Sequence, residues 1–130
     1  MLRTLLALVL ATMFGGAGRC LVAQDTSDVN TAARHAFYAT IVRAHLITLA
    51  VAESAYFVAH GRFAIDLTSL TWLDGTPLPN MDDVEITMEL KDSTWHATGR
   101  APADSIIVCW ISASGSGRSA KRTLTRCAPH

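Results

Sequence analysis

The feature that most constrains the fold is a long helical pattern that runs up to a glycine at position 61. Residues 25–28 supply helix-capping side chains and negative charge at the start of this pattern, which continues to His60. At 1.5 Å per residue, a helix that begins after these caps is roughly 48 Å long, far beyond the usual three turns. Gly61 is placed to adopt the left-handed conformation that ends helices, so we expect the helix to stop there.

Apolar residues repeat along this helix at alternating spacings of four and three, which predicts one face that contacts a partner throughout. That face consists of Phe37, Ile41, Ala44, Thr48, Val51, Ala55 and Val58, and a second stripe of Tyr38, Val42, Leu49, Ala52 and Tyr56 widens it. The stretch 46–59 is apolar nearly all round, which is typical of a helix half wrapped by a sheet. Because Arg34, His35, Arg43 and His45 occupy the earlier turns, we expect no membrane span in the mature chain.

Strand patterns dominate after a loop at residues 74–80. In residues 84–90 apolar and polar side chains alternate, the period of a strand with one face on the core. Residues 91–93 predict a hairpin turn, and Trp95 begins the inner face of the next strand. The sequence therefore predicts an α+β fold, with one long helix packed on a three- or four-stranded antiparallel sheet.

The remaining strands are predicted from the C-terminal third of the chain. Residues 105–112 are apolar on both faces, as in a central strand, which would place Trp110 in the core. Residues 114–117 are expected to turn the chain. Residues 122–127 would then return as a fourth strand, with Cys127 opposite Cys109.

The junction between helix and sheet resembles that of type IV pilins and type II secretion pseudopilins. The positions that carry the resemblance are Tyr56, Gly61, Phe63, Leu67 and Leu70, where an aromatic residue and a leucine pair would dock the chain on the sheet. The strand patterns from Val84 to Cys109 continue it, and the resemblance implies a C-terminal disulfide loop. Pilins also carry a glutamate at the fifth mature position on an apolar stem; here the first glutamate is Glu53, so filament assembly is not implied with the fold.

The N-terminus and the cysteines indicate an exported protein of one domain. Residues 1–24 read as a secretory signal, with cleavage between residues 18 and 24, which leaves a single domain over residues 25–130. A retained membrane anchor and lipidation of Cys20 are the alternatives. Cys109 and Cys127 then form an even pair in a periplasmic or secreted protein, which favours a disulfide.

The residue patterns that usually carry catalysis or metal binding are missing, so we expect no enzyme. The five histidines show no HExxH arrangement, and no Gly-x-Ser-x-Gly motif is present. We expect no cofactor; calcium is the alternative, because a short acidic segment could supply oxygen ligands, although its spacing is not that of an EF-hand. That segment contains Asp74, Asn80, Asp82 and Asp83.

Two classes of function remain. The first is a structural or interaction protein, either an accessory subunit of a cell-envelope assembly or a minor pilin-type component, with a partner-facing helix at Phe37, Ile41 and Ala44. The second is a module that binds a small anion, a peptide or DNA, either through the outer face of the sheet or through a basic segment that consists of Arg118, Lys121, Arg122 and Arg126. A protein partner in the envelope is preferred, and nucleic acid is unexpected because the formal net charge is zero.

Overall fold

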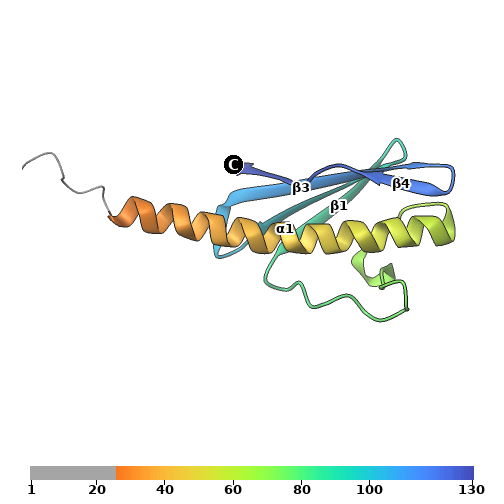
Figure 1. Cartoon of the computed structure of the whole chain (residues 1–130), viewed down its shortest axis with the longest axis horizontal. Coiled ribbons are helices and arrows are strands. Elements are labelled where there is room, and N and C mark those ends of the chain that lie inside the picture. The colour runs from red at the N-terminus through yellow and green to blue at the C-terminus, as the bar shows by residue number, and fades with distance from the viewer. Residues whose placement is uncertain (1–25) are drawn as a thin grey trace, which may run out of the picture. The chain divides into compact units, whose positions relative to one another are not determined.

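The computed structural model describes residues 26–130 and shows one long helix followed by five strands, an α+β arrangement (Figure 1). The expected fold class is therefore confirmed. The elements are helix α1 (Thr26–His60), the 3₁₀ helix η1 (Leu67–Ser69) and strands β1 (Glu85–Lys91), β2 (Thr94–Ala101), β3 (Asp104–Ser116), β4 (Ser119–Arg122) and β5 (Arg126–Pro129). The chain divides into two units, residues 1–31 and 32–130, and the account below concerns the second. The expected signal segment at residues 1–24, with Cys20, lies outside the described residues.

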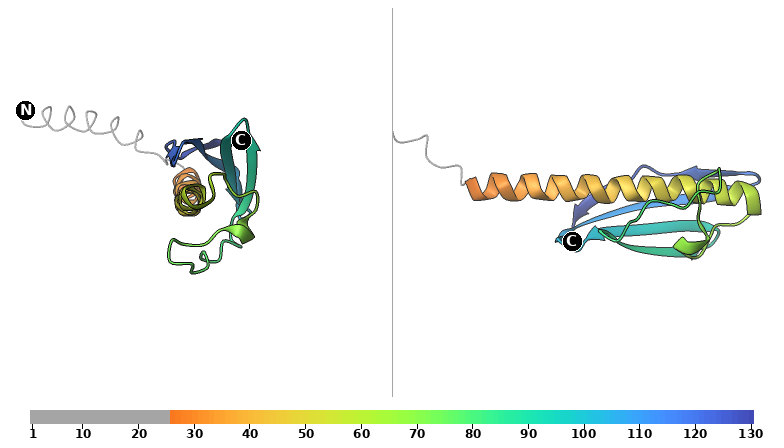
Figure 2. Two further views of the ribbon diagram at one scale, coloured as in Figure 1. Left: turned by 90° about the vertical axis from the view of Figure 1, so that its right-hand side faces the viewer. Right: turned by 90° about the horizontal axis from the view of Figure 1, so that it is seen from below.

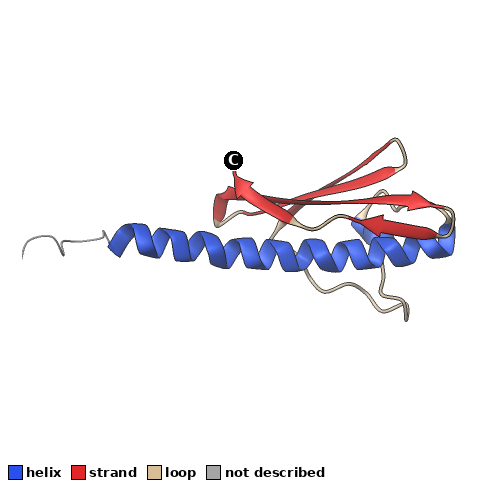
Figure 3. Ribbon diagram, turned by 45° about the horizontal axis from the view of Figure 1, so that its top comes forward, coloured by secondary structure: helices blue, strands red, loops and turns tan. Residues whose placement is uncertain are grey.

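The sheet is antiparallel throughout, with β1 at one edge and two short strands at the other (Figure 3). β3 is long enough to pair with β4 at Ala113–Ser116 and with β5 at Ile107–Trp110. The predicted fourth strand is thus divided in two. At the break, the Thr123 N–H donates to the Ser112 carbonyl, but the Ser112 N–H donates to the Thr123 hydroxyl and not to a backbone carbonyl.

The turn between β1 and β2 lies where the sequence places it. Asp92 and Ser93 have φ values of 48° and 64°, the positive pair that a two-residue hairpin turn requires. The turn predicted at residues 114–117 is wrong, because β3 continues to Ser116 and the chain reverses around Gly117. Gly115 is therefore a strand residue, and Phe57 of the helix lies directly over it.

One face of α1 packs on the sheet and forms the core (Figure 2). The buried helix residues are Val42, Leu46, Leu49, Ala50, Ala52, Glu53 and Phe57. They meet the inner side chains of β2 and β3, including Trp95, Ala97 and Ile111. At Gly99 the helix approaches so closely that a Cβ atom would lie 2.9 Å from a methyl carbon of Val42. The buried face includes three residues of the second predicted stripe, Val42, Leu49 and Ala52, but its other four members belong to neither stripe. No residue of the first stripe is buried.

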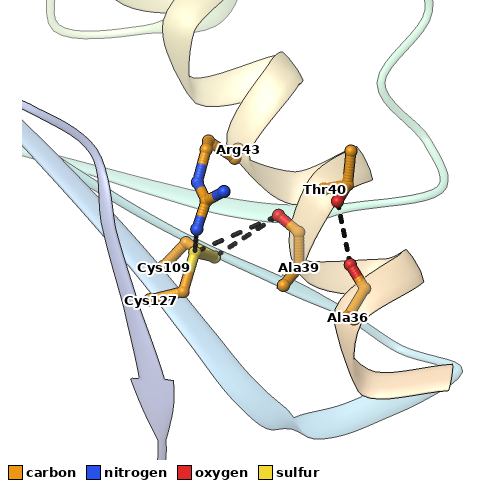
Figure 4. The surroundings of a disulfide bond; sticks show 6 residues. All are labelled: Ala36, Ala39, Thr40, Arg43, Cys109 and Cys127. Atoms are coloured by element: carbon orange, nitrogen blue, oxygen red, sulfur yellow. Dashed lines mark hydrogen bonds between the residues drawn. A yellow bond between two sulfur atoms is a disulfide. The ribbon is translucent and has the colours of Figure 1, made fainter. Parts of the chain in front are cut away.

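The predicted disulfide joins Cys109 of β3 to Cys127 of β5, which are paired directly across the two strands. Both sulfur atoms face the helix, at 3.9 and 4.0 Å from the carbonyl oxygen of Ala39, and Arg43 donates to Cys127 Sγ (Figure 4). The bond spans 18 residues of sequence. In the chain-entropy model, a loop of about this length contributes roughly 3 kcal/mol to stability.

Two histidine–aspartate contacts join the N-terminal and middle turns of α1 to the sheet region. His35 contacts Asp104, a buried residue at the start of β3, and His45 Nε2 lies 2.9 Å from the carboxylate of Asp83 just before β1. Both carboxylates lie where β1 and β3 begin, which is one end of the antiparallel sheet, so these contacts hold that end of the sheet to α1. Each becomes a full ion pair when its histidine is protonated.

Gly61 ends the helix in the left-handed conformation, with φ of 69° and its N–H bonded to the carbonyl of Phe57 at 2.7 Å. A Cβ atom at this position would meet nothing within 4 Å, so any cost of substitution arises from the backbone. We expect Gly61→Val to lower the free energy of unfolding by about 1–2 kcal/mol, and Gly61→Asn by much less, since asparagine tolerates positive φ. Urea titration of the three proteins measures this; a valine variant within about 0.5 kcal/mol of wild type would contradict the cap.

Candidate interaction surface

The helix face turned away from the core is apolar and is exposed except at Val51 and Ala55, which are half-buried. We call it the outer helix face; it consists of Phe37, Ala44, Ile47, Val51, Ala55 and Val58. Phe37 and Val58 expose 61% and 62% of their surface. Ile41, the third residue predicted to face a partner, is half-buried and packs against the core. An exposed apolar row of this length on a folded domain (residues 32–130, called the head below) is typical of an interaction surface.

A groove opens over the C-terminal end of the outer helix face. Val51, Ala55 and Val58 form its floor, with Leu73 of the loop on one side and Ala120 of β4 on the other. Its volume is about 450 Å³, and Leu73 is 86% exposed. An apolar side chain or a helix of a partner could pack here and bury Leu73 together with Val58.

Helix α1 is also long and apolar enough to cross a membrane, by length and composition alone. Its most apolar 18-residue window has a mean hydropathy of 1.4, and 39% of that window is buried in the fold. Core helices and signal sequences share these properties, so the absence of a membrane span stays a prediction. The half that packs on the sheet owes its apolar character to the core.

The residues predicted to join helix and sheet lie together at the end of α1. Tyr56 stacks on His60 with ring centroids 4.0 Å apart, and Phe63 packs on Phe57 at 4.7 Å. Leu70 is buried, whereas Leu67 lies at the rim of a cavity of about 590 Å³ between the loop and β1. The junction thus anchors the chain after Gly61 to the core.

The predicted basic residues are all exposed, and they lie on or beside β4 and β5. Trp110, which the sequence places in the core, is 42% exposed; that prediction is wrong. Its neighbour Cys109 points towards the helix in the disulfide, so the alternation of a strand turns Trp110 outwards. There it lies opposite Arg126 of β5 and Thr98 of β2.

Three of the four residues suggested as calcium ligands use their side-chain oxygens in contacts within the protein. The carboxylate of Asp74 accepts from Thr76, the Asn80 side chain accepts from the Asp82 N–H, and Asp83 contacts His45. Within residues 26–130 no group of three or more histidine, cysteine or acidic residues could hold a metal ion. These contacts stabilise turns in the loop before β1.

Glu53 is a buried acid that the sequence analysis did not single out. One carboxylate oxygen accepts from the Ala64 N–H at 3.0 Å, and the other has no hydrogen-bond partner. Burial raises the pKa of Glu53 from 4.5 to about 7, while the bond from Ala64 lowers it. Its signal in the sequence is an acid in the middle of a stretch that is apolar nearly all round.

No known protein family matches this chain, and neither a curated protein nor a solved structure is significantly similar to it.

Proposed function

We propose that this protein is a non-enzymatic, exported interaction subunit with a pilin-like head, which serves as an accessory component of a cell-envelope assembly. The observation that carries the proposal is the outer helix face, an apolar row of which Phe37, Ala44, Ile47 and Val58 are exposed to solvent. The long helix on an antiparallel sheet and the order of residues at the junction support the pilin-like reading. A minor pilin or pseudopilin is the closest alternative.

A second candidate, a periplasmic module for an anionic ligand or DNA, is favoured by one specific arrangement. Trp110 and Arg126 lie side by side on the outer sheet face, where an aromatic ring and a guanidinium could bind a base or a phosphate. Arg126 is accompanied by three further bases on the hairpin and β4. Such binding would be sensitive to salt and to the loss of these bases.

Site-specific photo-crosslinking in the native cells tests the proposal. A photoreactive amino acid at Val58 or Phe37 is expected to give a discrete adduct of this chain with an envelope protein. The matched control is Leu90, which is 49% exposed but lies on β1, away from the outer helix face. Adducts at Leu90 that equal those at Val58, or no adduct at either helix position, would contradict the proposal. An adduct of two copies of this chain would favour the minor-pilin alternative.

A further inference from the structure

The charged side chains of the head are segregated by element. Residues 66–92, which comprise η1, the following loop and β1, contain seven acids and one lysine. Residues 105–130, which include β4 and β5, contain four bases and no acid. We call the first set the acidic edge (Asp66, Asp74, Asp82, Asp83, Glu85, Glu89 and Asp92) and the second the basic edge (Arg118, Lys121, Arg122 and Arg126). Every one of these residues is exposed.

The two edges lie on opposite sides of the head. β1 and β4 are at the two ends of the strand order, so the sheet itself separates them. In the view along the helix, the loop before β1 and strand β4 also lie on opposite sides of α1 (Figure 2, left). A molecule that binds one edge therefore leaves the other edge free.

Contacts within the head do not neutralise either edge. The ion pairs among residues 26–130 engage Asp83 and Glu85 of the acidic edge and no residue of the basic edge. Hydrogen bonds from Thr68 and Thr76 lower the pKa of Asp66 and Asp74 respectively, which keeps both carboxylates ionised. Both edges thus keep charge that is available to a second molecule.

We infer that the partner of each edge is a second copy of this chain, with the acidic edge of one head docked on the basic edge of the next. Residues 25–130 contain nine lysines and arginines and eleven acids, a formal charge of −2, so long-range repulsion between copies is weak. A polyanion at the basic edge would be repelled by the acids of the same small head, whereas a second copy supplies the complementary edge. Because the two edges differ, the contact between two copies is head-to-tail. Each pair keeps one free acidic edge and one free basic edge, so further copies can add and form a row.

This contact uses the charged sheet edges, and Arg122 of the basic edge also lines the groove over the C-terminal end of the outer helix face. Phe37 and Ala44, which do not line that groove, would stay free for an envelope partner, so the inference goes beyond the proposed function. The two can fail separately: association through the helix face would be apolar and insensitive to salt, and association through the edges is electrostatic.

Charge reversal tests the inference by sedimentation velocity of the full chain. In about 0.01 M salt, where the screening length is roughly 30 Å, we expect the sedimentation coefficient of the wild type to rise with concentration; in about 1 M salt it should remain that of a monomer. Arg118→Glu/Lys121→Glu and Asp82→Lys/Glu89→Lys should each remain monomeric alone. Mixed in equal amounts, the two variants should form heterodimers, which a misfolded variant could not do.

The matched control is Arg34→Glu/Arg62→Glu, which makes the same change in charge at exposed positions outside both edges. It should associate as the wild type does. A wild type that is monomeric in low salt, association that persists in high salt, or a mixture that does not recover association would overturn the inference. Binding of a short DNA duplex to the basic edge in place of self-association would also overturn it.

Discussion

Glu53→Gln is expected to stabilise the fold above neutral pH, by up to about 3 kcal/mol. The wild-type carboxyl is buried in the core with one oxygen unpartnered, and burial holds its pKa near 7 in place of 4.5. At 1.36 kcal/mol per pKa unit, that difference sets the upper limit of the cost of ionising it in the folded state. Glutamine keeps an acceptor for the Ala64 N–H and carries no charge, so it avoids this cost.

The sign of the pH dependence follows from the raised pKa. The folded-state pKa of Glu53 lies above its unfolded value of 4.5. The protonated side chain therefore contributes fully to the free energy of unfolding below about pH 4.5, and this contribution is lost as the pH rises to about 7. Wild type and Glu53→Gln should therefore have similar stability near pH 4.5 and diverge up to about pH 8, as measured by denaturant titration at each pH. Glu89→Gln, at an exposed position on β1, is the control and should follow the wild type. If the free energies of unfolding of wild type and Glu53→Gln changed in parallel with pH, the raised pKa of Glu53 would be contradicted.

Gly115→Val is expected to destabilise the head by about 3 kcal/mol, the upper end of the usual cost of overpacking a core. A Cβ atom at Gly115 would lie 2.1 and 2.2 Å from two ring carbons of Phe57, which is buried and packed against Phe63. The ring therefore has little room to move. Thermal or urea unfolding measures the loss, and Ser114→Val at the neighbouring exposed strand position should change stability little.

A double-mutant cycle distinguishes the clash between valine and Phe57 from the loss of backbone flexibility that any replacement of Gly115 causes. If the valine collides with the ring, Gly115→Val should cost much less in a Phe57→Ala background than in the wild type. Additive effects of the two substitutions would contradict the packing of Phe57 on Gly115.

Local patterns in the sequence predict the elements of this fold well. The extent of α1 and the hairpin at Asp92 and Ser93 were predicted because each depends on residues close in sequence. The pairing of Cys109 with Cys127 was predicted because they are an even pair in a chain with an apparent signal segment. Strand alternation could have placed Trp110 correctly: if Cys109 faces the helix, its neighbour in the strand must face solvent.

Features that depend on packing between distant residues were not predictable in this way. The helix has two apolar stripes, and only the contact with β2 and β3 decides which stripe is buried. Gly115 reads as part of a flexible turn until Phe57, 58 positions earlier, is seen to pack on it. The contact of His35 with Asp104 spans 69 positions and leaves no local pattern. The outer helix face was predicted only in part: Ile47 was not included, and Leu73 lies beside this face only because of how the loop folds.

The central claim is tested most directly by purifying the native protein from its own cell envelope. The purified sample identifies the mature N-terminus and the proteins that accompany it. The wild type should begin at a residue between 18 and 25 and carry envelope-complex subunits in fixed stoichiometry. Phe37→Ser/Val58→Ser should lose these subunits, while Leu90→Ser/Leu124→Ser, an equivalent loss of exposed apolar surface elsewhere, should retain them. A wild type that purifies alone, or partners that both variants retain equally, would contradict an interaction subunit that docks through its helix.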